Sequence, residues 1–299
     1  MPATRTAIKQ AVGASDSRPL AWVTGAAGLI GNYLVEQAER HGSQWRVCAL
    51  TRRELDLTDF KKVEGRFARE RPALIIHCAA LSKSPQCQAD PKLAWKINFE
   101  ATRLLSELSC EGRFIFFSSD LVFDGQKGNY VEADAPRALS VYAETKIAAE
   151  EAVLKNPRHS IVRTSLNGGT SPAGDRGFNE EMRRAWQNGK SLRLFVDEFR
   201  TPIPAEFTAR SVWELAAVGA SGIYHIAGAE RLSRWQIGEL IARRWPQLNP
   251  RIEKASLREY QGAPRAPDTS LNCSKVQKLL SFQLPGLTQW LQDHSEEVF

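Results

Sequence analysis

Residues 20–31 read LAWVTGAAGLIG, and this stretch decides the fold. Its first five residues are almost entirely apolar, which is typical of a strand buried on both faces of a parallel sheet. Gly25, Gly28 and Gly31 follow directly and open a helical pattern. Gly25 permits a tight turn, Gly28 lets a pyrophosphate approach the backbone, and Gly31 allows the helix to pack closely on the strand. The stretch therefore predicts a dinucleotide site at a helix N-terminus, and an ordinary glycine-rich turn is the alternative.

The same alternation of strand and helix continues along the chain. Short apolar runs occur at residues 20–24, 46–50, 73–80, 113–118, 160–164 and 222–227. Helical patterns lie between them at residues 31–41, 59–70, 90–109 and 140–154. Such alternation predicts a doubly wound α/β fold of the Rossmann type, with a six-stranded parallel sheet.

The second part of the chain has a different pattern. After residue 166 the alternation weakens, and helical patterns at residues 179–188, 233–245 and 287–294 are separated by loops rich in glycine and proline. Asp197 and Glu198 are expected to be solvated loop acids, and the tryptophans of this part are expected in its core. The chain thus divides into three predicted parts: a flexible tail at 1–19, a Rossmann domain at 20–166 plus 200–227, and a smaller discontinuous substrate-binding cap at 167–199 plus 228–299.

Composition excludes several classes of protein. The chain has 299 residues, 42% hydrophobic and 25% charged, which is ordinary for a globular domain and argues against a fibrous or disordered chain. The formal charge is +6, but the basic pairs are scattered, so no nucleic-acid partner is expected. Five cysteines without a C-x-x-C spacing predict neither disulfides nor a metal site. No apolar run approaches the roughly 18 residues of a membrane span, so a cytoplasmic protein without a membrane partner is expected.

Two adjacent arginines predict which cofactor the dinucleotide site prefers. Arg52 and Arg53 follow the second predicted strand, about 20 residues after the glycines, where a site for NAD carries an acid. A guanidinium group suits the 2′-phosphate of NADP(H), so NADP(H) is the preferred cofactor. A solvated arginine pair is the alternative, and Glu54 next to it keeps NAD(H) as a second cofactor. Asp56 and Leu57 are expected at the adenine edge.

A second motif supplies acid chemistry. Tyr142 and Lys146 are four residues apart, which places the phenol and the ammonium on one face of a helix. Reduction of a ketone needs a proton at the developing alkoxide, and a nearby cation lowers the pKa of a tyrosine that delivers it. Alone, this spacing is common on helix surfaces. Here the strand at 113–118 ends just before Ser119 and Asp120, so hydroxyl and carboxyl groups are expected at the same sheet edge.

Together these residues resemble a known family, the extended short-chain dehydrogenases/reductases, and within it the dTDP-4-dehydrorhamnose reductase group. The resemblance covers residues 20–299. Besides the motifs above, it rests on ELDLTD at 54–59, CAA at 78–80, the segment from Asp90-Pro91 to Ile97-Asn98, SSDLVFDG at 118–125, YVEAD at 130–134 and VRTS at 162–165.

The resemblance implies roles for individual residues. Ser119 positions the substrate oxygen, Tyr142 donates the proton and Lys146 binds the nicotinamide ribose. With the motifs, it places cofactor contacts at Gly25, Gly28, Leu29, Ile30, Gly31, Arg52, Arg53, Asp56, Leu57, Cys78, Ala79, Ala80, Tyr142, Lys146, Thr164 and Ser165. It places substrate contacts at Ser82, Ser119, Asp120 and Leu166. Asn98 either supports a water path to the lysine, as in relatives, or is a buried asparagine hydrogen-bonded to backbone.

The expected activity is NADP(H)-dependent reduction of a keto group on a nucleotide-activated (deoxy)sugar or a similar polar small molecule. Leu166 replaces an aromatic residue of the rhamnose reductases, and Ser82-Lys83 replaces their Val-Asp pair, so dTDP-4-dehydrorhamnose itself is expected to be a poor substrate. One alternative is a sugar-nucleotide epimerase or dehydratase, against which the arginine pair argues. The other is a non-catalytic NADP-binding regulatory subunit, like the beta subunit of methionine adenosyltransferase. A homodimer is compatible with the family.

Overall fold

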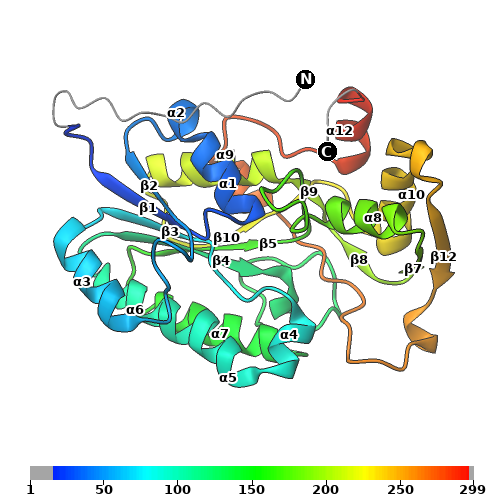
Figure 1. Ribbon diagram of the computed structural model, residues 1–299, viewed down its shortest axis with the longest axis horizontal. Coiled ribbons are helices and arrows are strands. Elements are labelled where there is room, and N and C mark those ends of the chain that lie inside the picture. The colour runs from blue at the N-terminus through cyan, green and yellow to red at the C-terminus, as the bar shows by residue number, and fades with distance from the viewer. Residues whose placement is uncertain (1–15, 296–299) are drawn as a thin grey trace.

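Six parallel strands form the central sheet of the computed structural model, which describes residues 16–295 (Figure 1). The predicted tail at 1–19 lies almost wholly outside the described residues. The strands are β1 (Leu20–Thr24), β2 (Arg46–Leu50), β3 (Leu74–His77), β4 (Arg113–Ser119), β5 (Ser160–Thr164) and β10 (Gly222–Ile226). Their order is β10-β5-β4-β3-β1-β2. The predicted doubly wound sheet is confirmed, and its six strands match the six apolar runs.

The strand order places a crevice at one point of the sheet. The chain leaves β1 for β2 on one side and returns to β3 on the other side of β1. At such a switch point the loops after neighbouring strands diverge, and open α/β sheets bind ligands in the gap. The loops that follow β1 and β3 are the glycine turn and residues 78–80.

Helices cover both faces of the sheet, so that this part of the molecule has three layers, helix, sheet and helix (Figure 1). One face carries α1 (Leu29–Glu36), α2 (Ala38–His41) and α9 (Ala205–Ala217), and the other carries α3 (Phe60–Glu70), α4 (Ser84–Ala89), α5 (Pro91–Ala94), α6 (Ala101–Leu108) and α7 (Val141–Val153). Alternate side chains of β1 divide between the two cores: Ala21 and Val23 pack toward α1 and α9, and Leu20 and Trp22 toward α3 and α6. Burial on both faces explains why the strand is apolar throughout.

Local sequence signals start three of these helices, α3, α5 and α7, where expected. Asp59, Asp90 and Ser140 each accept a backbone N–H of the first turn, as N-cap residues do. The helix predicted over 90–109 is interrupted by a π-helix, η1 (Trp95–Glu100), which separates α5 from α6. Helix α9 was not predicted, although its buried face packs on α1.

The cap lies beyond one end of the sheet (Figure 1). Its helices are α8 (Phe178–Gln187), α10 (Arg234–Arg244) and α12 (Leu287–Asp293), and its larger strand pair is β7 (Ser191–Phe195) parallel to β12 (Arg251–Ala255). The remaining short elements of the chain, some in the cap and some outside it, are η2 (Asp120–Val122), β6 (Asn167–Gly168), β8 (Phe199–Arg200), β9 (Ile203–Pro204), β11 (Leu232–Ser233), η3 (Pro246–Leu248), η4 (Leu257–Glu259) and α11 (Ser274–Gln277). The buried rings of Trp186, Trp245 and Trp290 form much of its core, as expected.

The cap strands were missed because β12 lies in a segment that prolines interrupt, and the others are two to five residues long. Among residues 16–295, no helix combines the length and apolarity that crossing a bilayer requires.

Candidate active site

The glycine turn forms a cradle that only glycine permits. Gly25 has φ +69, and a Cβ there would lie 2.7 Å from the backbone nitrogen of Ala79. A Cβ on Gly31 would lie 2.3 Å from the carbonyl oxygen of Gly25. The turn is closed by a hydrogen bond from Gly28 N–H to that same oxygen. No side chain caps α1 and its first turn holds no acid, so the N–H groups of Leu29 and Ile30 suit an anion.

The arginine pair lies at the end of β2, beside this cradle in the sheet. Arg52 and Arg53 are both exposed, and Arg52 Nε lies 3.3 Å from Asp56 Oδ2. Asp56 also accepts the N–H and hydroxyl of Thr58, and these bonds lower the pKa of its carboxyl. Asp56 is therefore engaged in the loop itself. The cradle and the two guanidinium groups fit the diphosphate and 2′-phosphate of NADP(H).

Residues 78–80 line the other side of the switch point. Ala79 N–H donates to Thr24 Oγ1 at 3.3 Å, which ties this loop to the end of β1. Burial raises the pKa of the Cys78 thiol, so the group stays a neutral thiol. Thr164 is the last residue of β5 and Ser165 follows it, and Thr164 Oγ1 accepts a hydrogen bond from Asn167 Nδ2 at 2.9 Å. These predicted cofactor contacts thus lie in loops at the carboxyl ends of the parallel strands.

The three predicted catalytic residues come from two elements that pack together. Ser119 ends β4, and Tyr142 and Lys146 lie on consecutive turns of α7. All three are buried, with exposed fractions of 8%, 7% and 3%. Lys146 Nζ donates to the carbonyl of Phe117 at 2.7 Å and lies 4.4 Å from the centre of the Phe116 ring. The structure therefore brings the predicted set together at the carboxyl end of β4.

A buried ion pair anchors the next turn of α7. Arg163 on β5 donates from Nε and Nη2 to the two carboxylate oxygens of Glu150, at 2.9 and 2.6 Å. Such a bidentate pair fixes orientation as well as distance. Because Glu150 is one turn beyond Lys146, this pair fixes the position of α7 relative to β5 near the lysine.

Burial dominates the titration of the two α7 groups. It raises the pKa of the Tyr142 phenol, while the nearby Ser119 hydroxyl lowers it and the Asp120 carboxylate raises it. Burial also lowers the pKa of Lys146 to about 8, and Glu150 acts in the opposite direction. We expected Lys146 to lower the pKa of the phenol. In the described structure its ammonium donates to the carbonyl of Phe117.

Asn98 links the cofactor loop to α7. Its Oδ1 accepts Leu81 N–H at 2.8 Å, and its Nδ2 donates to Leu81 O at 3.2 Å and to Thr145 Oγ1 at 3.1 Å. Asn98 is therefore a buried asparagine hydrogen-bonded to backbone, and its support of a water path to Lys146 stays a prediction. Thr145 in turn donates to the carbonyl of Tyr142 at 2.8 Å, so Asn98 couples the loop after β3 to the catalytic helix.

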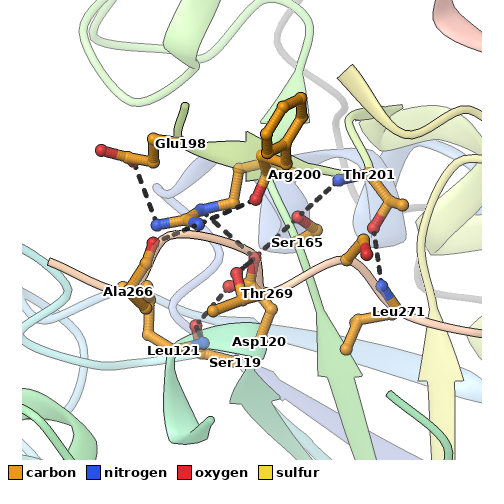
Figure 2. A network of polar contacts seen from close by, with 12 residues as sticks. Ser119, Asp120, Leu121, Ser165, Glu198, Arg200, Thr201, Ala266, Thr269 and Leu271 are labelled. Atoms are coloured by element: carbon orange, nitrogen blue, oxygen red, sulfur yellow. Dashed lines mark hydrogen bonds and ion pairs between the residues drawn. The ribbon is translucent and has the colours of Figure 1, made fainter. Parts of the chain in front are cut away.

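Asp120 lies at the centre of a second network (Figure 2). It accepts hydrogen bonds from Ser119 Oγ at 3.1 Å, Ser165 Oγ at 2.7 Å and Thr269 Oγ1 at 2.9 Å. Arg200 Nε lies 3.6 Å from Asp120 Oδ2. Asp120 is 4% exposed, so its predicted contact with substrate stays a prediction, while its contacts in the structure run to the protein.

The other predicted substrate residues lie where the sheet meets the cap. Ser82 and Lys83 are exposed, and Lys83 Nζ lies 3.3 Å from Glu181 on α8, so this ion pair joins the loop after β3 to the cap. Leu166 is half-buried and packs on the apolar core of the cap. Its side chain thus borders the junction of the two parts.

Sequence analysis missed several residues of this junction. Arg200 and Thr269, which contact Asp120, lie in segments with no recognisable motif. Glu198 was expected to be a solvated loop acid, and this is wrong: it is 1% exposed and pairs with both Arg200 and Arg265. The signal available was two acids followed by an arginine, Asp197, Glu198 and Arg200, but only the folded chain brings their partners together.

A glycine cradle at the switch point and a Ser-Tyr-Lys set at the end of β4 define a nicotinamide-dependent oxidoreductase of the short-chain type. The family model described as the RmlD substrate binding domain matches residues 21–298, so the chain belongs to this family. A dTDP-4-dehydrorhamnose reductase from Streptomyces griseus is 34% identical over 222 residues, 70% of either chain. The predicted resemblance to extended short-chain dehydrogenases/reductases and the predicted enzyme class are confirmed.

Two further proteins are similar to this chain. The crystal structure of a hypothetical dTDP-4-dehydrorhamnose reductase from Sulfolobus tokodaii has a TM-score of 0.80 at 29% identity, and the match covers 90% of this chain and 97% of that one. The methionine adenosyltransferase 2 subunit beta of Xenopus laevis is 27% identical over 275 residues, covering 87% of this chain and 82% of the relative.

Proposed function

We propose that this protein uses NADPH to reduce the keto group of a nucleotide-activated deoxysugar. The observation that carries the proposal is the convergence of the buried side chains of Ser119, Tyr142 and Lys146 at the carboxyl end of β4, in a chain that also has a glycine cradle and an exposed arginine pair. A protein that only bound the dinucleotide would need the cradle and the arginines. It would not need a buried phenol and a serine hydroxyl at the sheet edge.

The cofactor, when bound, supplies the hydride. Arg52 and Arg53 hold the 2′-phosphate, and the first turn of α1 holds the diphosphate. Lys146 binds the nicotinamide ribose. Ser119 orients the keto oxygen, and Tyr142 delivers the proton to that oxygen as its negative charge develops. All three side chains are buried, and this burial keeps bulk water from the site.

A turnover assay tests the proposal. NADPH absorbance is followed with a panel of dTDP- and UDP-linked 4-keto sugars that includes dTDP-4-dehydrorhamnose, and the products are identified by mass spectrometry. We expect oxidation of NADPH with at least one sugar of the panel and a product two mass units heavier than its substrate. Absence of turnover with every sugar, despite NADPH binding, overturns the proposal.

A second function is favoured by the similarity to the methionine adenosyltransferase beta subunit. In that case the chain would bind NADP and modulate a partner enzyme. Titration with a methionine adenosyltransferase catalytic subunit, followed by analytical ultracentrifugation, decides between the two functions. A stoichiometric complex together with no keto-sugar turnover supports regulation.

The division of the chain is part of the proposal. An apolar core to which α8, α10, α12 and β7 contribute supports the proposed cap at 167–199 plus 228–299. Val276 and Leu284 instead pack on the sheet, so we assign the segment around α11 to the Rossmann side. A homodimer, the absence of nucleic-acid binding and a cytoplasmic location stay predictions.

A further inference from the structure

A buried arginine at the boundary between the sheet half and the cap reaches the edge of the sheet that carries Ser119. Arg200, on β8, is 5% exposed. Its Nη1 donates to the carbonyls of Phe199 and Ala266, at 2.9 and 3.3 Å, and its Nη2 lies 3.1 Å from Glu198 Oε1. The cap therefore holds this guanidinium from three directions. Its remaining nitrogen, Nε, faces Asp120 Oδ2 at 3.6 Å (Figure 2).

Asp120 in turn determines the orientation of the Ser119 hydroxyl. Ser119 Oγ accepts the N–H of Leu121 at 3.2 Å and donates its only proton to Asp120 Oδ1 at 3.1 Å. A hydroxyl has one proton and two lone pairs, so the direction of this bond also decides where the lone pairs point. Rotation of the Asp120 carboxylate would change the donor geometry that Ser119 offers to a substrate oxygen.

The burial of Asp120 explains why a cation is needed there. Three neutral hydroxyls contact the carboxylate, and within residues 16–295 Arg200 is the one cationic side chain within 4 Å of it. Removing one partner of a buried pair leaves an uncompensated charge, which is strongly unfavourable. A carboxylate that has lost this partner turns toward other donors or toward water, and that movement alters its bond to Ser119.

We infer that Arg200 is a positioning residue: through Asp120 it orients the Ser119 hydroxyl, so that the placement of the cap sets the geometry of the reaction. This inference rests on the proposed function. Arg265 provides a matched comparison, because it also pairs with Glu198, at 2.6 Å, but has no contact with Asp120.

The test compares Arg200→Gln, Arg200→Lys and Arg265→Gln. The wild type and each variant, in excess over the keto sugar of the panel that the wild type reduces fastest, are mixed with NADPH or with NADPH deuterated at the transferred position, and the single-turnover rate is measured. NADPH binding by calorimetry counts the folded sites. We expect Arg200→Gln to lower the rate per site by about ten- to a hundredfold, since small misplacements at a reacting centre have effects of this size. We expect an isotope effect at least as large as in wild type, NADPH affinity within about threefold, and partial recovery in Arg200→Lys.

Equal rates per site for Arg200→Gln and Arg265→Gln would show that Arg200 only stabilises the cap, and this overturns the inference. If the wild type turns over no keto sugar, the proposed function fails, and a crystal structure of Arg200→Gln then decides the inference separately. Displacement of the Asp120 carboxylate from Ser119 supports it. A carboxylate that keeps its bonds to Ser119, Ser165 and Thr269 overturns it.

Discussion

Two buried polar clusters of this protein differ in their chemistry. The first cluster begins at the ends of β1 and β3, where Thr24 Oγ1 lies 2.7 Å from His77 Nδ1. His77 Nε2 lies 3.0 Å from Thr102 Oγ1, and Thr102 donates to Asn98 O at 2.7 Å. This cluster is uncharged, because burial and the charge of Lys146 lower the pKa of His77 to about 3. At the cap junction, by contrast, Asp120 and Glu198 meet Arg200 and Arg265.

The difference shows how each cluster serves the site. The neutral chain joins β1, β3 and α6, elements of a single packed core, and each hydroxyl in it accepts one bond and donates another. The charged cluster joins the sheet to a separate layer, where orientation must be kept across an interface. Charged hydrogen bonds give stronger directional control, at a greater cost when a partner is lost. We therefore expect changes near the neutral chain to affect stability and changes near the charged cluster to affect catalysis.

The largest effect is expected for Tyr142→Phe, which removes the proton donor on the sheet side and leaves the ring in place. Turnover should fall by at least about a hundredfold, the usual range for loss of a general acid. NADPH affinity should stay within a few-fold of the wild type. Steady-state assay with the keto-sugar panel and calorimetry measure the two quantities. Retention of more than a tenth of the wild-type turnover contradicts the assigned role.

Replacing both Arg52 and Arg53 with Ala removes the charge-assisted contacts to the 2′-phosphate. Affinity for NADPH should fall on the order of a hundredfold, from two charged hydrogen bonds, and affinity for NADH should change little. Calorimetric titration of the variant with each cofactor tests this prediction. Arg69→Ala, an exposed arginine at the far end of α3, is the control. Equal losses for the two cofactors would mean that the arginines do not read the phosphate.

The pH dependence of cofactor binding should follow Lys146. Its pKa of about 8 means that the ammonium is present below pH 8 and is lost as the pH rises through that value. NADPH affinity should therefore fall by about tenfold between pH 7 and pH 9, if the protonated lysine is the binding form. The variant Lys146→Met should bind more weakly and show no such decline. An unchanged decline in that variant would assign it to another group.

The smallest effects distinguish the two clusters most directly. Thr102→Val, in the neutral chain, leaves His77 Nε2 without its partner and should lower the free energy of unfolding by about 1–2 kcal/mol, with kcat within about threefold of wild type. Thr269→Val removes one donor to Asp120 and should cost similar stability but lower kcat further. Denaturant unfolding and steady-state kinetics give both numbers for both variants. Matching kcat values for the two variants would remove the functional distinction between the clusters.

Local sequence determined much of the sheet half. The glycine turn, the N-cap residues Asp59 and Ser140, and the pairing of Tyr142 with Lys146 on one helical face all depend on residues within a few positions of one another. Backbone sterics and helical periodicity act over that range, so they can be read from the chain directly. The six apolar runs predicted the strands because a strand buried on both faces is apolar along its whole length.

The tertiary structure alone decided the cap junction. Thr269 lies 149 residues from Asp120, and the short cap strands bring Arg200 to the same carboxylate from a segment with no motif. Asn98 reached Leu81 and Thr145 only because a π-helix and α7 pack side by side. Ion pairs and buried hydrogen bonds form wherever folding brings complementary groups together, and they leave no periodic trace in the sequence. For that reason the sequence determined the fold and the chemical groups of the site, and the packing of cap on sheet determined which residues orient them.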